Sequence, residues 1–189
     1  MDILKIKTAI ACCVFLLSTC HQGTATSASA SASAPPAHIT TSLQQGMHQW
    51  PAFDGKLVLV AGTSTDTLKY KRSLTFYFVE KSGAEWLHVP IVQDEANFTL
   101  TWLSISTGET TVADAVVALH DRQPYLILAR RNAKSAAIDM RTFKFAQSGD
   151  DFPDGPAYLF KPVATNTYQQ KTMSVEDALK KEAQRKPTK

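Results

Sequence analysis

Two histidines are the side chains best suited by type to acid–base chemistry in this chain. His120 precedes Asp121, and a carboxylate beside an imidazole is the pair that orients a general base. Adjacent residues of an extended chain point to opposite faces, so this pair cannot form a dyad by itself, and a polar hairpin turn is the preferred interpretation. His88 lies in the apolar stretch EWLHVPIV, which is typical of a core or edge histidine with a structural role.

Acidic and hydroxyl side chains gather in two further segments. Asp150, Asp151 and Asp154 in SGDDFPDGP carry the oxygen ligands that calcium prefers, but their spacing does not match an EF-hand loop. Asp, Gly and Pro are also the residues that turns require. The segment STGETT (106–111) carries hydroxyls and a carboxylate around Gly108, and a turn with Gly108 at positive φ is the simpler interpretation. The sequence therefore predicts no metal site.

Sequence motifs of the common catalytic sites are missing. The chain contains no HExxH, CxxC or G-x-S-x-G motif and no phosphate-binding loop, and its 8 glycines leave little material for such a loop. We therefore assign no catalytic residue and expect no cofactor. An enzyme stays an alternative only if its site is assembled from scattered residues, for instance His88 or His120 with Glu109 or Asp114.

Two adjacent arginines offer a different kind of chemistry. Arg130 and Arg131 end the apolar run YLILARR, which reads as a strand. Neighbouring residues of a strand face opposite ways, so one of the two guanidinium groups is expected to face out. An exposed guanidinium can bind an acidic partner or a phosphate headgroup, and Arg130 and Arg131 are our candidates for partner binding.

The amino terminus has the layout of an export signal. Lys5 and Lys7 precede an apolar run of 12 residues from Thr8 to Thr19. This run suits a signal peptide and is shorter than the roughly 20 residues of a membrane-spanning helix. At its end, Leu17-Ser18-Thr19-Cys20 resembles the bacterial lipobox, in which a lipid-modified cysteine follows a leucine and two small residues. The resemblance implies a bacterial membrane lipoprotein precursor that is cleaved before Cys20 and acylated there.

Other fates of this segment stay open. Thr19 stands where the lipobox usually has Gly, Ala or Ser, and cleavage in the following Ala/Ser tract would release a soluble periplasmic protein, whereas no cleavage would leave a membrane anchor. Cys20 is favoured because it lies where the apolar run stops, whereas Cys12 and Cys13 lie inside the run. His21 follows in place of the aspartate that signals inner-membrane retention, so the resemblance implies an outer-membrane lipoprotein facing the periplasm.

Three regions follow from this interpretation. Residues 1–19 form the signal peptide, residues 20–49 a lipidated cysteine with a disordered Ser/Ala/Pro tether, and residues 50–189 a single globular domain. Cleavage leaves Cys20 as the only cysteine, so the mature chain is expected to have no disulfide. The net charge of +3 is small and carries no basic footprint for nucleic acid.

Strand patterns fill most of the domain. LTFYFV (74–79) alternates as a covered central strand, and NFTLTWLSI (97–105) alternates as a strand with one wet face. Short turns then predict a four-stranded antiparallel meander over 97–145, extended by strands at 56–62, 68–80, 85–92 and 157–162. The predicted fold is mainly β, an antiparallel meander that is sandwich-like or a partly closed barrel, with one C-terminal helix. The alternative is α+β.

The predicted helix starts at Ser174, which can act as N-cap for Asp177 three residues on. Val175, Ala178, Leu179 and Ala183 then line one side. The segment TTVADAVVAL (110–119) also fits a helical spacing, but its β-branched residues and flanking turns favour a strand.

Two functional classes fit these observations. The first is a lipid-anchored binding or protective lipoprotein, held in the membrane by acyl chains on Cys20, that acts on a protein or envelope component. Immunity proteins and inhibitors are examples of this class. The second is an envelope hydrolase or transferase with a scattered site. The missing catalytic motifs favour the first.

Overall fold

The structure is a computed structural model, and it describes residues 39–40, 43–66, 69–94, 97–149, 155–170 and 172–185. The predicted signal peptide, Cys20 and the Ser/Ala/Pro tract lie outside the described residues, as do Asp150, Asp151 and Asp154. All described residues belong to one compact unit that spans residues 34–189.

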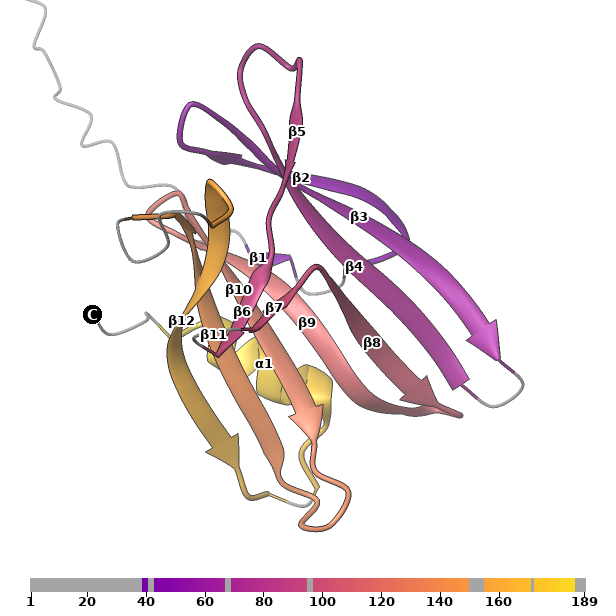
Figure 1. Ribbon diagram of the computed structural model, residues 1–189. Helices are drawn as coiled ribbons and strands as arrows, with labels where there is room; N and C mark the ends of the chain where they lie inside the picture. The colour runs from indigo at the N-terminus through magenta and orange to yellow at the C-terminus, as the bar shows by residue number, and fades with distance from the viewer. Residues whose placement is uncertain are drawn as a thin grey trace, which may run out of the picture. The chain divides into compact units, whose positions relative to one another are not determined.

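One mostly antiparallel sheet makes up nearly all of this unit, which confirms the predicted mainly β fold (Figure 1). Its strands run in the order β2-β3-β4-β8-β9-β10-β11-β12-β6-β7, with β1 on β9 and β5 on β4. β12 and β6 pair in parallel, and the sheet does not close into a barrel. The strands are β1 Ile39–Thr40, β2 Gly46–Ala52, β3 Gly55–Asp66, β4 Lys69–Val79, β5 Trp86–His88, β6 Ile91–Asp94, β7 Asn97–Thr99, β8 Thr101–Thr107, β9 Thr110–His120, β10 Gln123–Arg131, β11 Ile138–Gln147 and β12 Tyr158–Tyr168.

The predicted meander is present as β8 to β11, joined by short turns. Gly108 has a φ of 55°, as its position in the first turn requires. Asp121 and Arg122 have φ values of 52° and 64°, so the second turn is a two-residue hairpin whose twist matches its strands. The ambiguous segment 110–119 is strand β9, because it pairs with β10 along its length and its side chains alternate between two apolar clusters.

Two predicted strands are each broken into two. The segment 97–105 bends at Leu100, so that β7 pairs with β6 while β8 pairs with β4 and β9. The segment 85–92 breaks at Val89–Pro90, because proline has no N–H to donate to the ladder. β5 therefore stays on β4, and β6 crosses to β12.

Ordered structure begins before residue 50, so the predicted boundary of the tether is wrong. β2 starts at Gly46 and pairs with β3 along its length, and Leu43 is fully buried. β2 was missed because it is an edge strand with exposed residues such as Met47, and its fold depends on backbone pairing with β3 rather than on an alternating pattern.

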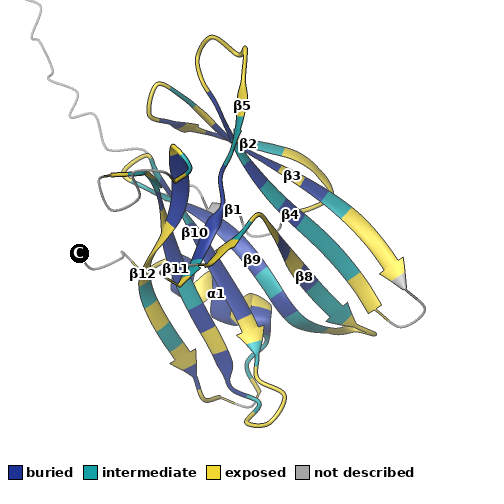
Figure 2. Cartoon of the chain, in the orientation of Figure 1, coloured by how far each residue is buried: buried dark blue, intermediate teal, exposed yellow. Residues whose placement is uncertain are grey.

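Apolar residues of β9, β10 and β11 divide between the two faces of the sheet (Figure 2). One face joins Val117, Leu126 and Phe143 to residues of β3, β4 and β12 in what we call the interior cluster. Aromatic contacts cross this cluster between strands that are not neighbours in the sheet, such as Phe76 with Phe160 at 4.9 Å between ring centroids. The sheet therefore folds back on itself around the interior cluster. The other face carries Val116, Ile127 and Met140 against the helix.

The helix α1, Val175–Ala183, forms as predicted and packs on β9, β10 and β11. Ser174 is its N-cap and accepts a hydrogen bond of 3.0 Å from the Asp177 N–H. Val175, Ala178, Leu179 and Ala183 are buried on the sheet side, as the spacing indicates. Glu182 is buried as well, and its carboxylate accepts hydrogen bonds from Tyr168 at 2.8 Å and Asn166 at 3.0 Å.

Tyr168 makes the stability of the domain depend on pH in the alkaline range. Burial and the neighbouring Glu182 carboxylate raise the pKa of Tyr168 to about 12 from the usual 10.0. Above pH 10 the unfolded chain loses this proton first, so stability is full below that pH and falls as pH rises toward 12. Between about pH 8 and about pH 11 we expect the wild-type chain to lose about 1 kcal/mol more unfolding free energy than Tyr168→Phe. Urea unfolding at both pH values measures this difference, and equal losses would contradict it.

Candidate functional site

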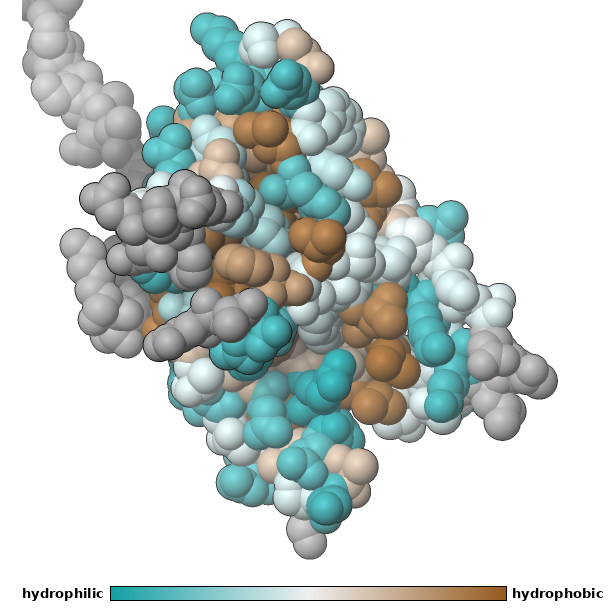
Figure 3. All heavy atoms as spheres, in the orientation of Figure 1, coloured by the Kyte–Doolittle hydropathy of each residue, from teal (hydrophilic) through white to brown (hydrophobic). Residues whose placement is uncertain are grey.

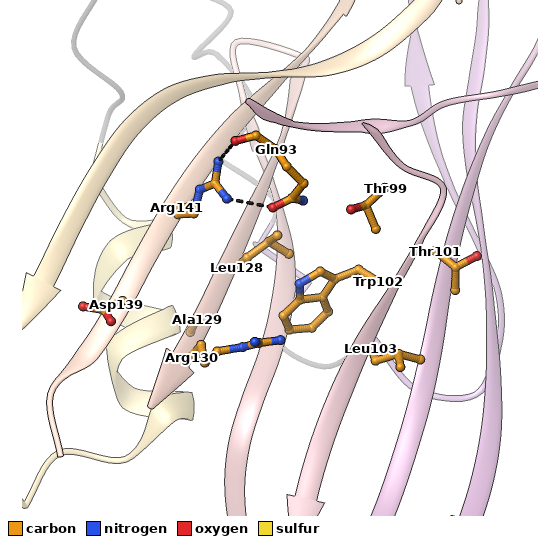
Figure 4. Close-up of a pocket in the computed structure, with 10 residues that line it drawn as sticks. All are labelled: Gln93, Thr99, Thr101, Trp102, Leu103, Leu128, Ala129, Arg130, Asp139 and Arg141. Atoms are coloured by element: carbon orange, nitrogen blue, oxygen red, sulfur yellow. Dashed lines mark hydrogen bonds between the residues drawn. The ribbon is translucent and has the colours of Figure 1, made fainter. Parts of the chain in front are cut away.

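A hollow of about 420 Å³ lies where β8, β10 and β11 face the β6–β7 hairpin (Figure 4). β10 and β11 contribute charged residues, β8 contributes Trp102 and Leu103, and the hairpin contributes Gln93 and Thr99. The hollow lies on the sheet face of the interior cluster, because Leu128 belongs to both. We call it the β8–β10 pocket.

Arg130 supplies a positive charge to this pocket, and its guanidinium has no ion-pair partner among the described residues. It stands opposite Asp139 in the register of β10 and β11, where an ion pair would be expected. The Asp139 carboxylate instead accepts a hydrogen bond of 3.1 Å from the Thr167 hydroxyl on β12. Figure 4 shows Asp139 pointing away while the Arg130 guanidinium points toward Trp102. Arg130 is exposed, and among the described residues it has no ion pair or side-chain hydrogen bond.

Arg141, the second arginine of the pocket, is held in place by Gln93. Its guanidinium donates to the side-chain oxygen of Gln93 at 2.8 Å and to the Gln93 backbone carbonyl at 2.7 Å. The same group lies over the ring of Phe143, 5.1 Å from its centroid. This two-pronged contact ties β11 to β6 and holds the hairpin over the pocket.

Apolar side chains form the wall beside the two arginines. Trp102 and Leu128 are buried, whereas Leu103 is 42% exposed at the lip. Hydrophobic residues come to the surface over β8 in the space-filling view (Figure 3). Thr101 in the same wall already shares a hydrogen bond of 2.9 Å with Thr75. An exposed guanidinium beside an apolar wall can hold an anionic group, and the pocket contains no pair of side chains arranged as nucleophile and base.

Of the two predicted partner-binding residues, only Arg130 lines this pocket. Arg131 faces the other way and donates to the backbone carbonyls of Ala136 at 3.0 Å and Met173 at 2.6 Å. These contacts fix the β10–β11 turn and the segment before α1. The pattern LARRN thus contains one arginine with an open guanidinium and one whose contacts are structural.

Residues of the alternative scattered site are not brought together. Glu109 precedes β9 and His120 ends it, so the chain separates them by roughly 35 Å at about 3.3 Å per residue. Asp114, between them, accepts hydrogen bonds from Ser104 and the Ala115 N–H. His88 lies on β5, stacked on Tyr77 at 4.9 Å. Within the described part of the chain, no three His, Cys, Asp or Glu side chains are grouped as metal ligands.

Reasoning from the sequence singled out only Arg130 among the residues of the pocket and missed the others, including Gln93, Trp102, Asp139 and Arg141. The sequence held one signal for Arg141. In IDMRTFKF, Asp139 and Arg141 lie on the same strand face as the two buried phenylalanines, Phe143 and Phe145. Charges that interrupt an otherwise apolar face of a strand indicate a polar site on that face. Gln93 and Trp102 gave no such signal.

No helix within the described ranges has the length and apolar character needed to cross a membrane.

Comparison with known proteins adds a fold relationship. No protein-family model and no curated protein matches the chain. The chain is similar to a solved structure described as the crystal structure of CarG, at 20% sequence identity and a TM-score of 0.59. The alignment covers 74% of this chain and 92% of that one. At this identity the similarity shows a shared fold and no more.

Proposed function

We propose that this chain is a lipid-anchored binding protein of the bacterial envelope whose domain holds an acidic group of its partner at Arg130. The observation that carries the proposal is the Arg130 guanidinium in the β8–β10 pocket, which has no ion-pair partner among the described residues although Asp139 stands opposite it in the register. Arginine forms two parallel hydrogen bonds with a carboxylate or a phosphate, which gives orientation as well as attraction. The partner is therefore a protein or envelope component that carries such a group.

The anchor half of the proposal rests on the amino terminus. Lys5, Lys7 and the apolar run lead to Cys20, and the following Ser/Ala/Pro tract is the expected tether between the lipid and the domain. Acyl chains on Cys20 would hold the protein to the membrane. The proposed location is the outer membrane, with the domain facing the periplasm.

Cys20→Ala is expected to abolish labelling by a fatty-acid probe and to move the protein from the membrane pellet to the soluble periplasmic fraction. The physical reason is that stable attachment depends on the acyl chains. Cys12→Ala is the matched control, because Cys12 lies inside the apolar run and leaves with the signal peptide. Membrane retention of Cys20→Ala would contradict the anchor, and a soluble wild-type protein would favour ordinary signal cleavage.

Arg130→Glu is expected to reduce capture of an envelope partner by at least about tenfold at low salt, because the reversed charge repels the acidic group. The difference should narrow at high salt, where exposed charges are screened. Affinity capture from detergent-solubilised envelopes at two salt concentrations measures the effect. Lys144→Glu is the control, because Lys144 is an exposed cation of β11 outside the pocket. Equal capture by both variants, or a salt-independent loss, would overturn the proposal.

A further inference from the structure

We infer that the β8–β10 pocket takes a small amphiphilic monoanion, a molecule that joins one carboxylate or similar singly charged group to a flat apolar body. The inference rests on the proposed function, because it names the kind of acidic group that Arg130 holds. Three properties of the pocket support the inference: its net charge, the hydrogen-bonding groups that are available to a ligand, and the shape of its apolar wall.

The pocket can neutralise one negative charge. Its three charged side chains, Arg130, Arg141 and Asp139, sum to one positive charge, because the partners Gln93 and Thr167 are neutral and leave the charges of Arg141 and Asp139 in place. Of the two guanidinium groups, that of Arg130 has no hydrogen bond among the described residues. A polyanion such as a polyphosphate or a nucleic acid needs several open cations, so this charge pattern favours a monoanion.

The hydrogen-bond donors that remain belong to the polar residues of the lining, such as the side-chain amide of Gln93 and the other N–H groups of Arg141, and the apolar wall offers none. The Thr101 hydroxyl is shared with Thr75 at 2.9 Å, and the Gln93 oxygens accept from Arg141. Thr99 is the remaining hydroxyl of the lining without a hydrogen bond among the described residues. A highly hydroxylated ligand such as a sugar would place some of its hydroxyls against Trp102, Leu103 and Leu128, where they would stay unpaired once water is displaced.

The wall suits an apolar body of limited size. Trp102 and Leu128 line one side and Leu103 extends it to the lip. The volume of about 420 Å³ falls within the range of roughly 300–1,000 Å³ that small-molecule sites occupy. A single acidic side chain of a protein would fill only part of this space, whereas a flat ring next to a carboxylate would cover the Trp102 wall and reach Arg130.

Matched probes test this inference on the full-length protein. We would titrate naphthoate, the neutral naphthamide of the same shape, inorganic phosphate and pyrophosphate by calorimetry. Naphthoate is expected to bind at least about tenfold more tightly than naphthamide, since only the carboxylate pairs with Arg130. Neither phosphate nor pyrophosphate should compete, because neither covers the apolar wall. Equal binding of naphthoate and naphthamide, or displacement by pyrophosphate, would overturn the inference.

Variants assign the effect to the pocket. Arg130→Gln should erase the preference of naphthoate over naphthamide, whereas Lys144→Gln should preserve the preference. Leu103→Ala, at the exposed lip, should weaken both probes by the same factor. The indole N–H signal that disappears in Trp102→Phe should shift when naphthoate binds to the wild-type protein, and a shift confined to another tryptophan would place the probe elsewhere and overturn the inference.

These outcomes separate the inference from the proposed function. If naphthoate does not bind while partner capture still depends on Arg130, the pocket receives an acidic side chain of a partner, and the inference fails alone. If naphthoate binds as expected and no partner capture depends on Arg130, the proposed protein or envelope interaction fails and the monoanion site stands.

Discussion

Phe145→Ala is expected to lower the free energy of unfolding by about 3–5 kcal/mol, the largest effect of any single substitution considered for this domain. Phe145 is fully buried, and its ring lies within 5.3–5.9 Å of the rings of Phe53, Phe78, Tyr158 and Phe160. These rings come from the β2–β3 turn, β4 and β12, so Phe145 joins the two parts of the folded-back sheet. Its removal leaves a cavity that backbone held by sheet pairing on both sides cannot fill.

Urea unfolding at neutral pH measures this loss. Phe98→Ala is the control, because it deletes the same side chain from a position that is 40% exposed, and it should cost less than about 1.5 kcal/mol. Similar costs for both variants would mean that the interior cluster is loosely packed around Phe145.

Asp114→Ala is expected to destabilise the domain by about 3 kcal/mol, because it leaves the Arg72 charge without its partner in a largely buried site. Asp114 accepts hydrogen bonds from Ser104 at 2.9 Å and from Arg72 at 3.4 Å, and the two charged side chains are only 13% and 14% exposed. Arg72 also donates to the Leu43 carbonyl, so this group fastens the segment before β2 to β4 and β9. Its Nε atom is buried without a hydrogen bond to any described group.

A double-mutant cycle separates two costs to the free energy of unfolding: leaving the Arg72 charge without a partner, and losing the other contacts of Asp114. In Asp114→Ala/Arg72→Met the uncompensated charge is removed as well, so the double variant should be more stable than the sum of the single losses by about 1 kcal/mol or more. Additive losses would show that Arg72 is solvated well enough to stand alone. Thermal and urea unfolding of the four proteins gives both values.

Local patterns predicted the elements whose pattern and partner lie close in sequence. The alternation in β4, the short turns from β8 to β11 and the Ser174 cap are each decided within a few residues, and each was predicted correctly. Long-range pairing could not be predicted in this way. Nothing in EWLHVPIV indicates that Val89 and Pro90 carry the chain from β4 across to β12, because the partner of Ile91 is Phe160.

For the candidate site, too, local patterns predicted some features, whereas others depend on contacts that are distant in sequence. The LARRN pattern predicted that one arginine of the pair would face out, which holds because strand geometry alternates the side chains. Which guanidinium stays open depends on partners distant in sequence, namely Thr167 for Asp139 and Met173 for Arg131. Those contacts exist only in the folded chain, so no local pattern could have singled out Arg130.

The parallel pairing of β6 with β12 also sets when the pocket can first exist during folding. Ile91 and its partner Phe160 are about 70 residues apart, and contacts of such sequence separation form late because loop closure must come first. The β8–β11 meander can assemble from neighbouring hairpins, whereas the backbone pairing that fixes β6 needs β12 at the far edge of the meander. A chain still emerging during synthesis therefore has the strand that carries Arg130 before it has the pocket. We therefore expect the complete pocket to form in one of the last steps of folding.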